Sequence, residues 1–196
     1  MQNNSFSQGS LDGVYQLYGV MEMASAFKFN PDHTFEFYYS YGAVDRQATG
    51  TYKLDGNNII LQSDKVAGQD FHIIKESRGK KPQIKVNAPQ AWFASNVVCR
   101  FIKGDQEEYV QTDEAGLAES TYSDCDVIMV LHGLYPDEWT LIKSKENQHQ
   151  YFEIGLNPSL EQVSFKGVIP SIEKDIISVK SEFLFGEKEV KFEKVE

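Results

Sequence analysis

A run of aromatic residues with period-two spacing constrains the fold of this chain more than any other feature of its sequence. Within Thr34–Tyr41 every second side chain is aromatic: Phe35, Phe37, Tyr39 and Tyr41 alternate with Thr34, Glu36, Tyr38 and Ser40. Successive side chains of a β-strand point to opposite faces, so this spacing predicts a half-buried strand. Burying the aromatic face of such a strand yields a core without any ligand.

The rest of the chain repeats this pattern of short strand-like runs separated by turn residues. The "DGNN" stretch is a hairpin signal, because Gly and Asn tolerate positive φ. The run "DVIMVL" has no alternation, so it predicts a central strand covered on both faces. No window gives a convincing amphipathic helix. We therefore predict an all-β fold, in which an antiparallel meander or small partial barrel is followed by a β-sandwich.

Composition shifts and turn signals divide the chain into four parts. We predict a disordered tail at 1–10, a β-meander at 11–77, a linker at 78–83 and a sandwich at 84–196. The linker is assigned because "RGKKPQ" is polar, basic and contains proline. The strand-like runs beyond it are spaced at intervals typical of a sandwich.

The charge balance limits the classes of partner. The chain of 196 residues is 41% hydrophobic and 24% charged, which is typical of a folded protein. Its net charge of -10 repels phosphate backbones and anionic lipids, so we expect no nucleic-acid partner. No apolar run approaches the roughly 20 residues needed to span a bilayer, so we expect no membrane insertion.

The N-terminal stretch and the cysteines bear on the compartment. "MQNNSFSQGS" has no basic region followed by an apolar one, which argues against a signal peptide. The chain as written is expected to be cytoplasmic, and to be exported or periplasmic if a leader has been removed ahead of it. Cys99 and Cys125 are interpreted as two buried free thiols, and a single bridge between them stays open.

Motifs for catalysis or metal binding are not found. The four histidines (His33, His72, His132 and His149) form no local metal motif, and no nucleophile motif or phosphate-binding loop is present. We therefore predict no catalytic residue and no cofactor. Loop carboxylates are weak calcium candidates if two loops share one end of the sandwich: Asp113, Glu114, Asp124 and Asp126.

Two groups of residues are candidate binding sites. Aromatic walls with a few polar groups are typical of small-ligand sites, so Phe37, Tyr39 and Tyr41 could line a pocket with Asp45 and Arg46 at its mouth. The alternative, that these rings are only a sheet core, is favoured by their alternation. Aromatics in loops are enriched at interfaces, which makes candidates of three further residues: Trp92, Tyr135 and Trp139.

Two resemblances rest on short motifs. The strand "VVCRFIKG", the hairpin "YVQTDEAGLAE" and the strand "DVIMVLHG" make Ile84–Leu156 resemble the carboxypeptidase-regulatory-like, transthyretin-like β-sandwiches. That family implies a noncatalytic companion module and a structural role for Thr112, Asp113 and Gly116. "DGVYQL" and "GTYKLDGNNIIL" make Leu11–Ser77 similar in style to small lipocalin-like modules, which implies a site for an apolar ligand.

These observations support three hypotheses for function. The first is a noncatalytic binding or protein-interaction module whose partner is unidentified. The second is a lipocalin-like protein that binds a small apolar ligand. The third is a hydrolase whose site is dispersed over the fold.

Overall fold

The computed structural model describes residues 11–195, in which strands dominate. The predicted disordered tail, 1–10, lies outside the described residues. The strands are β1 (Gly13–Tyr18), β2 (Met23–Phe29), β3 (Thr34–Tyr41), β4 (Val44–Asp55), β5 (Asn58–Ser63), β6 (Phe71–Ser77), β7 (Gln83–Asn87), β8 (Val97–Lys103), β9 (Gln106–Gln111), β10 (Leu117–Glu119), β11 (Val127–His132), β12 (Thr140–Lys143), β13 (Tyr151–Leu156), β14 (Ser171–Glu173), β15 (Ile176–Lys180) and β16 (Glu189–Val195). Two short helices are α1 (Ala91–Ala94) and α2 (Glu182–Phe185), and no helix among the described residues is long and apolar enough to cross a membrane. The predicted all-β class is confirmed.

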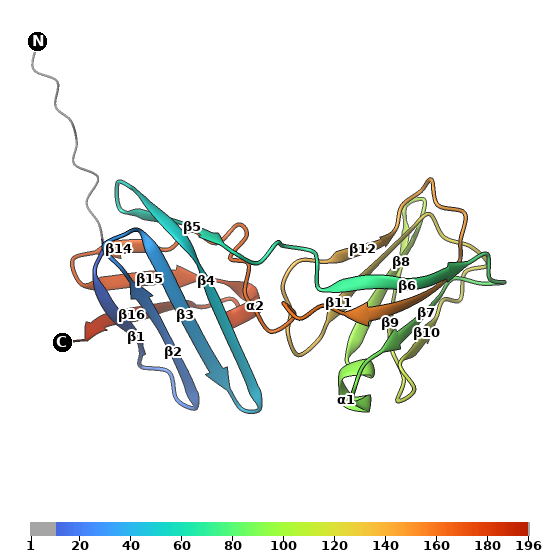
Figure 1. Cartoon of the computed structure of the whole chain (residues 1–196), viewed down its shortest axis with the longest axis horizontal. Coiled ribbons are helices and arrows are strands. Elements are labelled where there is room, and N and C mark those ends of the chain that lie inside the picture. The colour runs from blue at the N-terminus through green and yellow to red at the C-terminus, as the bar shows by residue number, and fades with distance from the viewer. Residues whose placement is uncertain (1–10, 196) are drawn as a thin grey trace, which may run out of the picture. The chain divides into compact units, whose positions relative to one another are not determined.

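Eight strands form a closed antiparallel barrel in the order β1-β16-β15-β14-β5-β4-β3-β2 (Figure 1). The first and last strands of the chain close it, with Val14 opposite Val195 and Tyr18 opposite Lys191. In Figure 1 the red C-terminal strands therefore complete the barrel that the blue N-terminal strands begin. Closure pairs the edges that an open meander would leave exposed.

The chain therefore divides differently from the sequence prediction. One compact unit comprises the residues up to Lys65 together with those from Gln162 onward, and the other spans Val66–Glu161. The predicted sandwich at 84–196 thus loses its last strands to the barrel, while β6, predicted in the meander, belongs to the second unit. The predicted linker at 78–83 only connects β6 to β7 within one sheet. Sequence patterns mark strands but do not identify their distant partners, and this is why the predicted division differs from the division of the structure.

The aromatic strand behaves as its alternation predicts over most of its length. Phe35, Phe37 and Tyr39 are buried in the barrel core, and the residues between them face outward. Tyr41 breaks the pattern with half of its surface exposed, because it lies at the last position of β3 beside a turn. The barrel interior is thus lined by rings from a strand whose outer face is polar.

A side chain from outside the strands fills the centre of the barrel. Phe165 lies in the irregular segment before β14 and is only 3% exposed. Its ring centroid lies 5.5 Å from that of Phe27, 5.9 Å from that of Phe35 and 4.9 Å from that of Phe37. The backbone of Phe165 has φ of 52°, a left-handed conformation that bulky residues rarely adopt. Tertiary packing therefore holds this ring in place.

The second unit is a two-layer arrangement of four-stranded sheets. One sheet has the order β10-β7-β13-β6 and the other β12-β11-β8-β9. Both sheets contribute inward side chains to one hydrophobic cluster, including Phe152 from the first sheet and Phe101 from the second. The predicted hairpin around Thr112, Asp113 and Gly116 is instead a crossing between the sheets, since β9 and β10 belong to different ones. Gly116 does take the predicted left-handed position, with φ of 75°.

Phe165→Ala tests whether the ring supports the barrel. Removing a buried phenylalanine ring leaves a cavity, so we expect the free energy of unfolding of the barrel to fall by about 3–5 kcal/mol. A urea titration in which hydrogen–deuterium exchange of β2 and β3 is the signal for unfolding measures this loss. Ile169→Ala changes an exposed apolar residue of the same irregular segment and should alter stability by less than about 0.5 kcal/mol. Equal effects of the two substitutions would contradict the central role of the ring.

Candidate functional site

The predicted ligand pocket beneath the rings of β3 is occupied by the protein itself. Phe37 packs against Phe27 and Phe165, at centroid distances of 4.6 Å and 4.9 Å. Tyr39 meets Phe185 of α2 at 6.0 Å, near the end of the barrel where β3 finishes. Tyr41 is exposed and takes no part in this cluster. These rings therefore form a filled core.

The other end of the barrel interior is closed by hydrogen bonds. The Tyr52 hydroxyl accepts a hydrogen bond from Leu11 N at 2.8 Å, and it lies 2.8 Å from Leu11 O and 3.1 Å from Asn30 O. Burial raises the pKa of Tyr52, so the hydroxyl keeps its proton and can donate it to one of these carbonyls. The backbone ahead of β1 is thereby fixed across this end of the barrel.

The adjacent charges Asp45 and Arg46 do not form a joint gate. The strand pleat turns Arg46 inward, where it is 3% exposed and its Nη2 donates to Gln162 O at 3.0 Å. Asp45 faces outward, 3.5 Å from the Tyr38 hydroxyl. Burial raises the pKa of Tyr39 on the neighbouring strand, and the positive charge of Arg46 opposes that shift. Consecutive residues of a strand face opposite sides, so they cannot serve one pocket.

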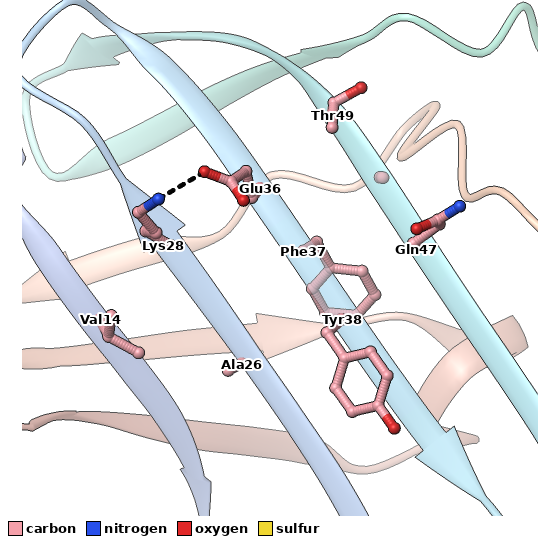
Figure 2. A pocket seen from close by; sticks show the side chains of 9 residues that line it. Val14, Ala26, Lys28, Glu36, Phe37, Tyr38, Gln47 and Thr49 are labelled. Atoms are coloured by element: carbon pink, nitrogen blue, oxygen red, sulfur yellow. Dashed lines mark hydrogen bonds and ion pairs between the residues drawn. The ribbon is translucent and has the colours of Figure 1, made fainter.

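A hollow of about 340 Å³ lies on the outer surface of the barrel, lined in part by Ala26, Lys28, Glu36 and Tyr38 (Figure 2). Its rim carries the Lys28–Glu36 ion pair, in which Nζ lies 2.6 Å from Oε1 and both side chains are half exposed. An ion pair in this setting contributes little, because water screens it. The hollow lies over the small side chain of Ala26 and is a shallow feature of the sheet surface.

A larger groove of about 480 Å³ lies where β1 and β2 are joined, and sequence reasoning missed it. Its apolar lining includes Tyr18, Met21, Met23 and Phe185. Met21 is 89% exposed, and an exposed methionine in the "YGVMEM" turn was the one available signal. Lys188, Glu189 and Lys191 also line the groove. Because these charges have both signs, they do not identify a class of ligand.

Of the three aromatic residues predicted at an interface, Trp92 and Tyr135 both contact the ring of Phe93, whose centroid lies 6.0 Å from that of Tyr135, and Trp139 contacts another residue. Trp92 lies on α1, is 43% exposed and stacks on Phe93 at a centroid distance of 3.7 Å. Tyr135 is buried, with its ring 5.3 Å from that of His132, and therefore serves as a core plug. Trp139 meets Tyr109 at 6.1 Å in an edge-on arrangement. They do not make one patch, and only Trp139 leads to a larger surface.

The loop carboxylates do not converge. Asp126 accepts a hydrogen bond from Gly104 N at 2.9 Å, and Asp124 is ion-paired with Lys103, so both lie near the turn that begins β9. Asp113 follows the far end of β9, where its Oδ1 accepts from Ala115 N and Leu117 N at 2.9 Å each. The length of β9 separates the two sites. Glu114 is exposed in the same turn as Asp113, and no metal-holding group of three or more His, Cys, Asp or Glu occurs among residues 11–195.

The outer face of the β12-β11-β8-β9 sheet is the feature that most needs an explanation. Direct pairing places four side chains in one row across it: Leu141, Met129, Arg100 and Tyr109. The row on one side contains Val127, Ile102 and Glu107, and the row on the other contains Leu131, Val98 and Gln111. Trp139 joins this face through its contact with Tyr109.

We call this surface the apolar sheet face and define it by its apolar members: Val98, Ile102, Tyr109, Val127, Met129, Leu131, Trp139 and Leu141. Tyr109 and Leu141 are 57% and 55% exposed, and the others are partly exposed. The non-alternating run "DVIMVL" supplies its central strand, β11. That run predicted a strand covered on both faces, and the prediction is wrong for the outer face. The apolar run was therefore the sequence signal for this surface, but it was interpreted as a sign that both faces of the strand are buried.

The other sheet of the same unit has a more charged outer surface, although its strand β6 also carries the exposed residues Ile73 and Ile74. Ile84 and Val86 of β7 point into the core, so their neighbours point outward. Lys85 lies opposite Glu153 of β13, and Glu153 lies opposite Lys75 of β6. Alternating charges of this kind are typical of a solvated sheet face. Two sheets that share a core thus differ in what their outer faces are suited to contact.

No protein-family model, curated protein or solved structure matches this chain. The fold class is therefore defined by the structure alone: an all-β protein with an eight-stranded antiparallel barrel and two smaller sheets.

Both cysteines are buried free thiols, and their environment predicts low reactivity. Burial raises the pKa of the Cys99 thiol far above its usual range, and it raises the pKa of Cys125 to about 11, an effect that Lys143 opposes. Thiolate is the reactive form, so at about pH 8 only on the order of one in a thousand Cys125 side chains is reactive.

We expect an aromatic disulfide reagent to label neither cysteine rapidly in native protein and both in urea. A rapid phase in native protein would contradict this.

Proposed function

We propose that this chain is a noncatalytic protein-interaction module that binds its partner through the apolar sheet face. One observation carries the proposal: β11 has the apolar pattern of a strand covered on both sides, but its outer face is partly exposed. Exposed contiguous apolar surface commonly marks an interaction site. A protein surface that packs on the face would complete the burial that the sequence pattern implies.

The composition of the face supports a protein partner. Tyr109, Trp139 and Met129 belong to residue types enriched at interface cores, as does Arg100. The guanidinium of Arg100 lies 5.8 Å from the centre of the Tyr109 ring and is ion-paired with Glu107. The charges on the face are thus satisfied before binding, which avoids leaving an unpaired charge beneath a partner.

The two sheets of this unit also fit the companion role that the resemblance to carboxypeptidase-regulatory-like domains implies. Modules of that kind act through contacts rather than chemistry. The lipocalin-like alternative has less support, since Phe165 and the rings of β3 fill the interior where an apolar ligand would lie.

A photo-crosslinking amino acid at Leu141 tests the proposal in extract of the source cells. We expect it to trap a discrete protein partner, because Leu141 is exposed at the edge of the face. The matched control carries the same group at Ile74, an exposed apolar residue of β6 in the other sheet. Adding Met129→Lys should abolish the Leu141 product without changing the circular dichroism spectrum. Identical products from both positions, or products that survive Met129→Lys, would refute the assignment of this face.

A further inference from the structure

We propose that the partner seated on the apolar sheet face is a second copy of this chain, so that two such faces pack on each other across a two-fold axis. The inference rests on the proposed function and specifies its partner. Two-fold pairing is the commonest symmetry of soluble oligomers, and it requires a surface that is complementary to itself. The charges of the face meet that requirement, and its rows of side chains are of the kind that pack between two sheets.

The first argument is charge complementarity. The face carries one cation, Arg100, and one anion, Glu107, on adjacent strands. Glu107 also accepts a hydrogen bond from the Tyr109 hydroxyl at 2.9 Å. The face is therefore neutral in a protein whose net charge is -10, and it offers no unpaired charge to a strongly acidic or basic partner. Across a two-fold axis, each Arg100 can approach the Glu107 of the other copy.

The second argument is geometry. Sheets pack face to face about 10 Å apart, with rows of apolar side chains interleaved between them. The apolar sheet face presents three mainly apolar rows, one across four strands and two across three. The face consists of eight apolar residues together with Arg100, Glu107 and Gln111, fewer than the roughly 20–30 residues per partner of a standard stable interface. The dimer should therefore be weak and reversible, with a dissociation constant on the order of 10–100 µM.

A salt effect follows from the same charges. Two copies that each carry a net charge of -10 repel one another through the field of the whole molecule, even when their neutral faces meet. Raising the salt concentration from about 50 mM to about 500 mM screens this repulsion and strengthens apolar association. Dimerisation should therefore increase with salt, whereas a complex with a cationic partner would weaken.

Sedimentation equilibrium of the full chain at up to about 500 µM tests the inference. We expect a monomer–dimer equilibrium for the wild type, and monomer only for the Met129→Lys, Leu141→Lys double variant. The control Ile74→Lys places the same charge on an exposed apolar residue of the other sheet and should leave the equilibrium unchanged.

A charge exchange separates a specific contact from general stickiness. Arg100→Glu puts four acidic groups into the paired faces and should weaken the dimer at least tenfold. Arg100→Glu combined with Glu107→Arg restores one charge of each sign and should recover most of that loss. Failure of the exchange to recover the dimer would overturn the proposed alignment of the two faces.

The outcomes also separate this inference from the proposed function. A wild type that stays monomeric at all concentrations and salt levels would overturn the second copy as partner. If Leu141 nevertheless crosslinks a different protein in a manner that Met129→Lys abolishes, the interaction function stands with that protein as its partner. A dimer that persists in the double variant would place self-association elsewhere on the molecule.

Discussion

The pairing of β1 with β16 is the constraint on which the rest of the structure depends. It joins the two ends of the described chain, and it requires every strand of the barrel to meet a partner on each side. Because β5 is followed in the barrel by β14, the whole second unit lies between two consecutive barrel strands. Its two sheets are therefore inserted in the sequence between two barrel strands, and the chain leaves the barrel after β5 and returns to it before β14.

The filling of the barrel directs attention from its interior to the surfaces of the protein. A closed barrel of eight strands is just wide enough for side chains to fill or for one small ligand to occupy. Here Phe165 enters from an irregular segment and meets the rings of β2 and β3. Its left-handed backbone persists because the surrounding rings hold it. The contrast between the two outer faces of the inserted unit then becomes the strongest indication of function.

The difference between the two outer faces is informative because the two sheets belong to the same unit and share one core. Lys75, Lys85 and Glu153 give one outer face the charges that water solvates. Met129, Leu131 and their neighbours give the other an apolar surface of the kind found inside proteins. Both sheets bury their inner faces against the same core, so the difference does not arise from folding of the unit. A second surface that packs on the apolar sheet face, as we propose, would account for it.

The sequence by itself determined the class of the fold and the inward or outward direction of many side chains. The alternation of Phe35, Phe37 and Tyr39 fixed which side of β3 is buried, because a strand has a period of two. The same periodicity turns Asp45 and Arg46 to opposite sides of β4, which the prediction of a shared pocket mouth did not take into account. Only the tertiary structure decided that the last three described strands complete the barrel, that Phe165 fills it, and that the outer side of β11 is partly exposed. These features depend on pairing and packing between residues far apart in the chain, and local patterns carry no record of which distant segments meet.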